Sequence, residues 1–330
     1  MAAPDTQLER AEQLAARLLP DRAPKRKMLV IVNPYATTVS DRLRNLVVYA
    51  LQARYSVEAV DTEERGHATQ ICRETASEGY DVVVAFGGDG TVNEAANGLA
   101  GSKTPLTCLP GGATNVFHRA IGIPTDVVDA TEHLLALADD LRPRRVDLGR
   151  VNDRYFTFSA GVGLDASVVE RVDAHPRLKT RLGEYYYTYA AFSTFSRKYL
   201  VNPPRVRVAV NGQELEGVTV IAQNAEPYTY FGRRPIRLSE DVSLDDGTLG
   251  LTVLKRATVF ELPTITWRAF SGKAGTVTRH RQIEAFPKTR EAHVTSLDGT
   301  PFPVQVDGDF VDSCTEVHYG VEPRALAVIS

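Results

Sequence analysis

Short apolar runs alternate with amphipathic segments between residues 28 and 123, and this alternation restricts the fold more than any other feature of the sequence. The apolar runs are residues 28–33 (MLVIVN), 57–60 (VEAV), 81–86 (DVVVAF) and 105–110 (PLTCLP). Segments with helical periodicity follow them, and Ser40 can cap the one that begins at Asp41. Strands that alternate with helices through short loops favour a parallel sheet covered on both faces. We therefore expect a doubly wound α/β domain.

The pattern changes near residues 142–150, where strands of alternating or aromatic character replace the strand–helix alternation. These predicted strands lie within residues 154–161, 204–223, 247–254 and 293–308. Asn211-Gly212 separates two of them and is a strong signal for a type I′ hairpin. The second half is therefore predicted to be antiparallel and rich in β-structure, apart from one helix-like stretch at residues 181–199.

A length of 330 residues fits two domains. We predict an N-terminal helix and basic linker at residues 1–27, an α/β domain at 28–146 and a β-rich domain at 147–330. Whether the last residues return to the first domain is left open.

The charge balance and the rare residue types exclude several classes of protein. There are 38 basic and 41 acidic residues, a net charge of −3, so no global positive field attracts nucleic acid. Three scattered cysteines argue against a disulfide framework, and the seven histidines show no paired ligand spacing, so we expect no zinc or iron site. No apolar run is long enough to span a bilayer, and the N-terminus lacks the apolar core of a signal peptide. We expect a cytoplasmic protein.

The strongest local motif is Gly87-Gly88-Asp89-Gly90-Thr91, which lies between a predicted strand and a predicted helix. Glycines there let backbone N–H groups approach an anion, and the start of the helix adds partial positive charge. The motif is neither a P-loop nor a dinucleotide fingerprint, since Asn93 stands where a third glycine would be. A plain tight turn is the alternative. It would need fewer glycines, so we favour a phosphate-binding loop.

A second loop, Pro110 to Asn115 (PGGATN), repeats this arrangement after the next predicted strand. Neighbouring parallel strands end at one edge of a sheet, so both loops are expected in one crevice, where open α/β sheets bind ligands. Asn33 and Thr62, each at the end of a predicted strand, are expected on the same edge. Two phosphate-friendly loops on one edge indicate a nucleotide site.

These motifs, taken in order, resemble the diacylglycerol kinase catalytic-domain family, specifically its soluble bacterial lipid kinases. The resemblance rests on Asn33-Pro34, Thr62 with GHAT at 66–69, GGDGTVNE, PGGATN, DDGTLGL and VDGD, and it covers about residues 28–330. Sphingosine kinases belong to the same family, and NAD kinases and phosphofructokinases share the GGDGT loop. The resemblance implies a C-terminal antiparallel β-sandwich domain, with the active site in the interdomain cleft.

The resemblance also implies roles for individual residues. ATP contacts would come from Asn33, Thr37, Thr62, Gly87, Gly88, Asp89, Gly90, Thr91, Asn93 and Thr114, with Asp89 near the transferred phosphate. A Mg²⁺ site would lie at Asp246, flanked by Ser243 and Thr248. Asp307 and Asp309 match a motif whose last acid is the proposed general base. Because that acid is usually glutamate, either the backbone lies closer to the acceptor here or the base is Asp307.

We therefore predict an ATP- and Mg²⁺-dependent lipid kinase that phosphorylates diacylglycerol or a similar lipid, in phospholipid biosynthesis. Its expected location is the inner membrane face, through transient surface contact. Basic clusters at Arg233, Arg234 and Arg237 and at 279–281 are candidate contacts, with a solvated face as the alternative. Aromatic residues at 185–199 could line an acyl pocket or a membrane interface, but core packing is favoured for that segment. An NAD kinase-like enzyme and a catalytically silent nucleotide- or lipid-binding regulator are the alternatives. Whether the chain forms a homodimer is left open.

Overall fold

The structure is a computed structural model that describes residues 25–174, 203–232, 234–258, 260–271 and 274–330. The helix predicted near the N-terminus and the helix-like stretch at 181–199 lie outside the described residues, as does Arg233.

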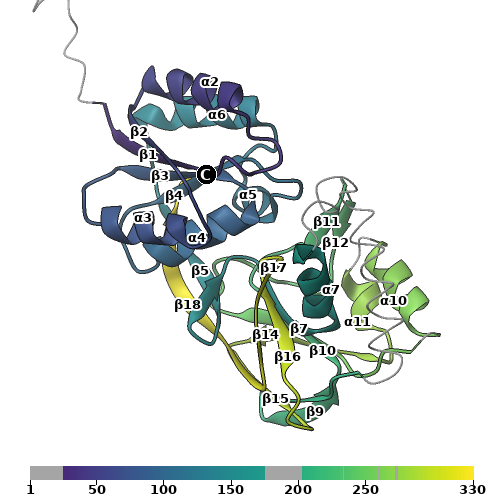
Figure 1. The fold of residues 1–330 in the computed structure, drawn as a ribbon. Coiled ribbons are helices and arrows are strands. Elements are labelled where there is room, and N and C mark those ends of the chain that lie inside the picture. Colours follow the sequence, from purple (N-terminus) through teal and green to yellow (C-terminus); the bar gives the residue numbers. More distant parts are fainter. Residues whose placement is uncertain (1–24, 175–202, 233, 259, 272–273) are drawn as a thin grey trace, which may run out of the picture.

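The N-terminal part alternates strands with helices, as predicted. Its elements are β1 (Lys27–Val32), α2 (Asp41–Gln52), β2 (Ser56–Asp61), α3 (His67–Thr75), β3 (Val82–Gly87), α4 (Asp89–Leu99), β4 (Leu106–Pro110), α5 (Val116–Ile121), α6 (Val127–Ala136) and a 3₁₀ turn (Leu137–Asp139). The strands are parallel in the order β2-β1-β3-β4. Helices α2 and α6 pack together on one face of this sheet, and α3 and α4 on the other (Figure 1).

Local sequence explains these elements. Every residue of β3 is buried, as expected for a central strand covered on both faces. The Ser40 hydroxyl accepts a hydrogen bond from the N–H of Leu43 at 3.3 Å and so caps α2, which confirms that prediction. Among the described residues, no helix is both long enough and apolar enough to cross a bilayer.

The C-terminal part is mainly antiparallel. Its elements are β5 (Arg144–Val151), β6 (Arg154–Phe156), β7 (Ser159–Gly163), α7 (Leu164–Asp173), β8 (Val206–Val210), β9 (Gln213–Gly217), β10 (Thr219–Gln223), β11 (Thr229–Phe231), β12 (Arg234–Ile236), β13 (Leu249–Leu254), α10 (Leu262–Ala269), α11 (Ala274–Thr278), β14 (Ile283–Thr289), β15 (Glu291–Ser296), β16 (Phe302–Val306), β17 (Asp309–Cys314) and β18 (Glu316–Val328). Asn211 and Gly212 join β8 to β9 with φ of 49° and 76°, which confirms the predicted hairpin.

Two sheets face each other across the C-terminal core. One has the order β14-β13-β10-β7-β16-β17, and the other contains β18, β15, β8 and β9. Apolar side chains from both sheets, including Val162, Val208, Val220, Val294 and Val304, form one buried cluster. This arrangement is the predicted β-sandwich.

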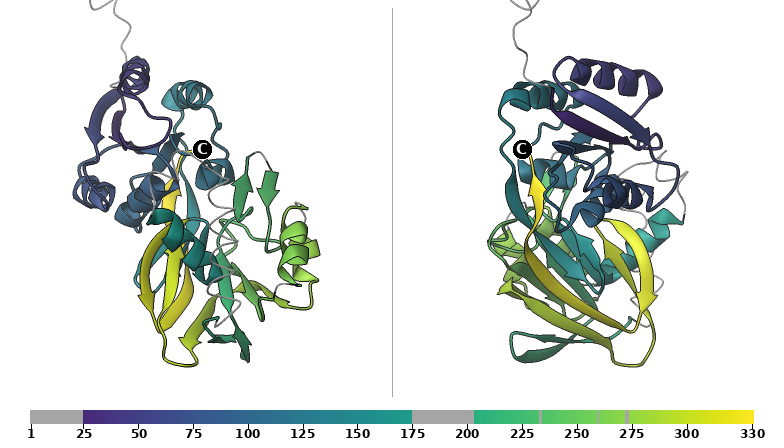
Figure 2. Two further views of the ribbon diagram at one scale, coloured as in Figure 1. Left: turned by 45° about the vertical axis from the view of Figure 1, so that its right-hand side comes forward. Right: turned by 90° about the vertical axis from the view of Figure 1, so that its left-hand side faces the viewer.

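The last strand connects the two parts of the molecule. β18 pairs with β15 near its start, with β5 along its length, and with β4 at its end, where Val328 lies beside Leu106. The N–H of Ile329 also donates to the carbonyl of Leu106 at 3.0 Å. The C-terminus consequently lies in the N-terminal part (Figure 2), and one sheet runs through both parts.

Candidate active site

The residues predicted to bind a nucleotide lie at the carboxyl ends of the parallel strands. The N–H of Asn33, just after β1, donates to the carbonyl of Phe86 in β3 at 2.9 Å, and the N–H of Thr62, just after β2, donates to that of Val32 at 2.8 Å. From the boundary between β1 and β3, the chain builds the sheet outward to β2 on one side and to β4 on the other. This boundary is the topological switch point, where open α/β sheets bind ligands.

The two glycine loops touch each other through their backbones. The N–H of Gly111 donates to the carbonyl of Gly87 at 2.9 Å. A Cβ added to Gly111 would lie 2.8 Å from the Cα of Gly87, and one added to Gly112 would lie 2.9 Å from the Cα of Gly88. Glycine is therefore required here by close approach, and the plain tight-turn interpretation does not account for the pair of loops.

Polar side chains hold the first loop in place. The side-chain amide of Asn33 donates to the Thr91 hydroxyl at 3.0 Å, and its oxygen accepts from the N–H of Tyr35 at 2.9 Å. Within the part of the chain that the structure describes, no side chain caps the first turn of α4. The N–H groups of that turn therefore remain suited to an anionic ligand. Thr37 lies exposed on the loop after Asn33.

Asp89 links the two loops. Its carboxylate accepts a hydrogen bond from the Thr114 hydroxyl at 3.1 Å and one from the N–H of Phe117 at 3.3 Å. Burial raises the pKa of the Asp89 carboxyl to about 7, a shift that the Phe117 hydrogen bond opposes and the charge of Asp307 increases. A carboxyl group that titrates near neutral pH beside a phosphate-friendly loop is typical of a functional site.

Asp307 forms part of a tight turn, but its side chain points inward. Asp307 and Gly308 have φ of 49° and 83° and join β16 to β17. The carboxylate accepts hydrogen bonds from the N–H groups of Thr157 (2.7 Å), Phe158 (2.9 Å) and Ser159 (3.0 Å), the hydroxyl of Thr157 (2.8 Å) and the side-chain amide of Asn93 (2.8 Å). Burial raises the pKa of this carboxyl, and hydrogen bonds from Ser159 and Thr157 oppose that shift. With 4% of Asp307 exposed, these donors occupy its oxygens.

Asn93 makes the contact that joins α4 to the C-terminal part. Besides Asp307, its amide donates to the carbonyl of Tyr155 at 2.9 Å, and its oxygen accepts from Arg154 at 3.0 Å. Asn93 is 1% exposed. The predicted ATP contact therefore does not fit Asn93, because its side chain is buried in the contact between the two parts.

Asp309, at the start of β17, meets the glycine loop from the opposite part of the molecule. A Cβ added to Gly90 would lie 2.5 Å from the Oδ2 atom of Asp309. The side chain of Asp309 is 29% exposed, and its Oδ1 atom lies 3.7 Å from the guanidinium of Arg65. Of the two acids in the turn, Asp309 is thus the one that solvent reaches.

The residues predicted to hold Mg²⁺ lie in a different contact network. One oxygen of Asp246 accepts from the N–H and hydroxyl of Thr248 at 2.9 and 2.6 Å, and the other pairs with the Lys288 ammonium at 2.5 Å. The same ammonium donates to the carbonyl of Asp241 at 3.0 Å. Burial raises the pKa of Asp246, but the hydrogen bonds from Lys288 and Thr248 outweigh it and leave the pKa lowered.

The Mg²⁺ site at Asp246 stays a prediction, because the carboxylate faces the half-exposed ammonium of Lys288 in this structure. The Lys288 ammonium already occupies the position between two oxygens where a cation would bind, and the hydroxyl of Ser243 donates to Asp245 at 2.5 Å. Ser243 and Asp245 instead line a pocket of about 280 Å³ together with Arg144. Among the described residues, Asp246 forms no hydrogen bond or ion pair with the glycine loops.

Sequence reasoning missed three residues that shape the site. Arg65 follows β2 and pairs with Asp309. The sequence feature that could have identified it is its position as a basic residue at the carboxyl end of a predicted strand. Glu94 accepts from the N–H groups of Gly66 and Ala68 at 2.9 and 3.2 Å and so caps α3. Asp147, 1% exposed, accepts from the N–H of Gly247 at 2.6 Å and holds that loop.

One of the two predicted basic clusters is not a free cationic surface. His280 is 6% exposed and lies 3.1 Å from Glu261, which also pairs with Arg281. Glu261 thus offsets the charge of the cluster at 279–281. In the other cluster, Arg234 is exposed, and Arg237 lies 3.6 Å from Glu226.

Known proteins share this arrangement over nearly the whole chain. The family model described as diacylglycerol kinase catalytic domain matches residues 27–151, and the one described as YegS C-terminal NAD kinase beta sandwich-like domain matches residues 158–330. A diacylglycerol kinase of Staphylococcus aureus (strain bovine RF122 / ET3-1) is 28% identical over 292 residues, which cover 87% of each chain. One of Staphylococcus haemolyticus is 27% identical over 270 residues, 81% of this chain and 77% of that one.

A solved structure shows the same likeness in three dimensions. The crystal structure of a diacylglycerol kinase from Bacillus anthracis str. Sterne superposes with a TM-score of 0.66 at 25% identity, covering 93% of this chain and 98% of that chain. The similarity therefore spans both parts of the molecule and the contact between them.

Proposed function

The chain belongs to the diacylglycerol kinase family and is a lipid kinase, and from this premise we propose that it transfers the γ-phosphoryl group of ATP to the free hydroxyl of diacylglycerol. One observation carries the proposal. The Asp309 carboxylate, from the C-terminal part, packs against Gly90 in the phosphate-friendly loop of the N-terminal part. A donor loop and a candidate base from opposite parts thus meet at one point.

The donor side is formed by the two glycine loops. The uncapped first turn of α4 supplies N–H groups and partial positive charge to the ATP phosphates. Asn33, Thr91 and Thr114 fix the shape of the loops, and Asp89 ties them together. Phosphoryl transfer depends mostly on positioning and charge stabilisation, so rigid loops of this kind supply much of what the reaction needs.

The acceptor side is assigned to Asp309. In this proposal its carboxylate accepts the proton of the lipid hydroxyl as the hydroxyl oxygen attacks the γ-phosphorus and ADP leaves. Asp307 is assigned a positioning role, because its oxygens are occupied by donors from residues 157–159 and Asn93. The shorter side chain of Asp309, relative to glutamate, is compatible with the close packing of its strand against Gly90.

Mg²⁺ fits the cleft between these loops better than it fits Asp246. Magnesium in kinases is held by one or two carboxylates together with substrate phosphates, where it neutralises charge on the transferred group. Asp309 is partly exposed beside the glycine loop and offers a carboxylate of the required kind, whereas the oxygens of Asp89 already accept hydrogen bonds from Thr114 and Phe117. We therefore expect the ion to arrive with ATP.

Transient contact with a membrane surface fits two exposed aromatic side chains near α10. Phe260 is 89% and Trp267 73% exposed, and aromatic rings favour the membrane interface. Sedimentation with vesicles that contain diacylglycerol tests this contact. We expect Trp267→Ala to reduce the bound fraction and Tyr49→Ala, which removes a 77% exposed ring on α2, to leave it unchanged. Equal binding of both variants would exclude α10 as the contact.

The activity is tested with purified full-length protein, Mg²⁺ and labelled ATP, offered diacylglycerol in mixed micelles or NAD. Label in phosphatidic acid supports the proposal. Label in NADP supports the NAD kinase alternative instead, and ATP binding without transfer supports the silent regulator.

The contact that carries the proposal is tested by Gly90→Ala. The added methyl group displaces the Asp309 carboxylate, while alanine favours the helix by up to about 1 kcal/mol. We expect turnover to fall at least about tenfold, equivalent to about 1.4 kcal/mol, in a protein that stays folded. Gly320→Ala is the matched control, since its methyl group would meet nothing nearer than 3.6 Å. Full activity in Gly90→Ala would show that this contact has no part in transfer.

A further inference from the structure

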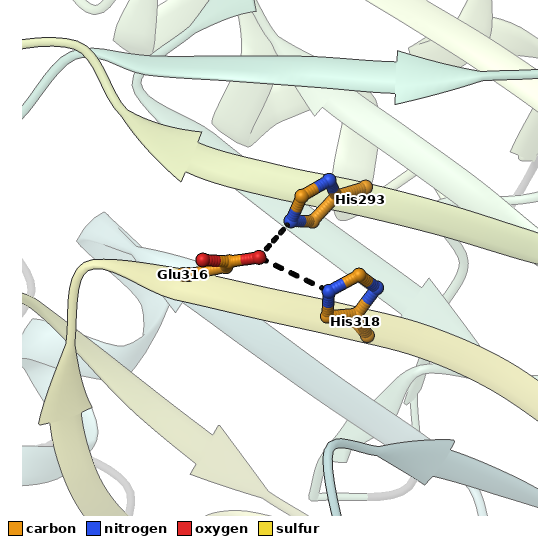
Figure 3. A group of neighbouring side chains, drawn as sticks. All are labelled: His293, Glu316 and His318. Carbon is orange, nitrogen blue, oxygen red and sulfur yellow. Dashed lines mark hydrogen bonds and ion pairs between the residues drawn. The ribbon is translucent and has the colours of Figure 1, made fainter.

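Two histidines and a glutamate gather on the solvent-facing side of the sheet at β15 and β18 (Figure 3). The antiparallel register places His293 directly opposite His318. Glu316 lies two positions before His318, on the same face of its strand. The neighbouring residues Val294 and Val317 are buried in the sandwich core. Strand pairing thus brings together three polar side chains that are distant or unremarkable in the sequence.

All three side chains converge on one point. The Nε2 atoms of His293 and His318 lie 2.6 and 3.1 Å from the Oε1 atom of Glu316. The two rings are stacked, with centroids 3.9 Å apart and planes inclined by 13°. One ligand atom from each residue lies within 4.8 Å of the other two. Zinc bonds of about 2.0–2.2 Å place ligand atoms roughly 3.3 Å apart, which is close to the present spacing. Because the stacked rings lie in nearly parallel planes, at least one imidazole must rotate about its χ angles to point its nitrogen at a shared ion.

The chemistry of the group suits a dication. Two imidazoles and a carboxylate are the ligands of a borderline transition metal such as zinc. Protonation of both stacked rings would place two positive charges face to face, whereas metal binding keeps both rings neutral. A glutamate carboxyl is ordinarily ionised at neutral pH, so Glu316 is present in its ligand form.

The surroundings leave the point of convergence open to solution. The exposed fractions of the side chains are 37% for His293, 54% for Glu316 and 61% for His318. On its other side, His293 pairs with Ala209 of β8, whose small side chain does not cover the ring. The backbone beneath is held in place, because the N–H of His318 donates to the side chain of Asn152 at 2.9 Å.

We propose that His293, Glu316 and His318 bind a first-row transition-metal dication of the zinc type, with water in the remaining coordination position. The site lies roughly 30 Å along β18 from the end that pairs with β4, at about 3.3 Å per residue. A bound ion would join β15 to β18, the strand that continues into the N-terminal part, and so add stability to this pairing.

Calorimetric titration of Zn²⁺ into tag-free, full-length protein tests the site. We expect one equivalent to bind with a dissociation constant in the micromolar range and to raise the melting temperature. His293→Gln and His318→Gln should each weaken binding by about tenfold or more. Glu291→Gln, which removes a surface carboxylate from the same face of β15, is the matched control and should bind like the unsubstituted protein.

Co²⁺ provides a second measurement, since a tetrahedral site gives intense visible absorption bands. Absence of saturable binding, or equal Zn²⁺ affinity in the His293→Gln/His318→Gln double variant, would overturn the proposal. Neither measurement requires ATP or lipid. The metal site and the kinase proposal can therefore fail independently.

Discussion

Two acidic motifs in the C-terminal part resemble each other in sequence but have different surroundings. The turn from Asp307 to Asp309 reaches Asn93 and Gly90 of the N-terminal part. The loop at residues 243–248 instead satisfies Asp246 with Lys288 and Thr248. Each motif combines two acids with a glycine, so the motifs differ mainly in the groups that the fold places opposite those acids. Asp309 faces the glycine loop, where we propose that it acts as the base, and Asp246 faces a lysine with which it forms an ion pair.

The largest effect in this comparison is expected from Asp309→Asn. Loss of a general base typically lowers turnover by about 10² to 10⁴-fold, and we expect that range in initial-rate assays with diacylglycerol. Asp312→Asn is the control, because Asp312 is an exposed acid on the same strand. A variant at position 309 that keeps more than a tenth of the normal rate would remove Asp309 from the mechanism.

Asp307→Asn is expected to act mainly on stability. Asparagine tolerates the positive φ of this position, but it presents an NH₂ group to a site filled with donors. Breaking a buried charged network costs about 3–5 kcal/mol, measurable by urea unfolding. Asp298→Asn is the matched control, since Asp298 precedes the glycine of an exposed turn and its replacement should change stability far less. Equal losses in the two variants would contradict the inward role of Asp307.

Asp89→Asn extends the comparison to the glycine loop. The pKa of Asp89 in the folded protein is about 7, above its ordinary value of 3.8, so the folded state holds this proton more tightly. Protonation of Asp89 therefore stabilises the folded state at low pH, and this stabilisation is lost as pH rises from about 4 to about 7. Because asparagine cannot ionise, the variant should be more stable at pH 8 by at most about 4 kcal/mol.

This advantage should shrink toward zero near pH 4, and urea unfolding at pH 5 and pH 8 measures it. A difference that does not depend on pH would mean that the Asp89 carboxyl is not shifted. Phosphoryl transfer by Asp89→Asn should fall at both pH values. Normal turnover would show that the loop is only a turn.

The smallest effect is expected from Asp246→Asn. Its partner Lys288 is half exposed, and an ion pair of this kind contributes about 0–1 kcal/mol. We expect turnover within about threefold of normal, equivalent to about 0.7 kcal/mol, and an unchanged Mg²⁺ requirement. A large increase in the Mg²⁺ concentration needed for half-maximal rate would restore Asp246 as a magnesium ligand.

Lys288→Met sharpens the same comparison. Without the ammonium, the oxygens of Asp241 and Asp246 lose the cation that lies between them. Mg²⁺ should then raise the melting temperature of the variant and leave that of the unsubstituted protein unchanged. If Mg²⁺ stabilises neither protein, the lysine is not a substitute for a metal ion.

Local sequence was enough to predict the elements that carry the donor loops. The buried run of β3, the Ser40 cap and the Asn211-Gly212 hairpin follow from near-neighbour chemistry, and the structure contains all three. The meeting of the two glycine loops was also predictable, because parallel strands end at a common edge. The buried position of Asn93 was not, because its partners lie far along the chain in Tyr155 and Asp307.

By itself, the sequence determined an α/β part followed by an antiparallel β part and the order of its motifs, because hydrophobic periodicity and turn residues act over short distances. Only the tertiary structure decided which acids face which partners. Tertiary packing set Asp309 against Gly90 and Lys288 against Asp246, and strand register set His293 against His318. Those contacts join residues far apart in the chain, so no local sequence pattern predicts them. The histidine pairing that is absent along the sequence arises from the register of β15 and β18.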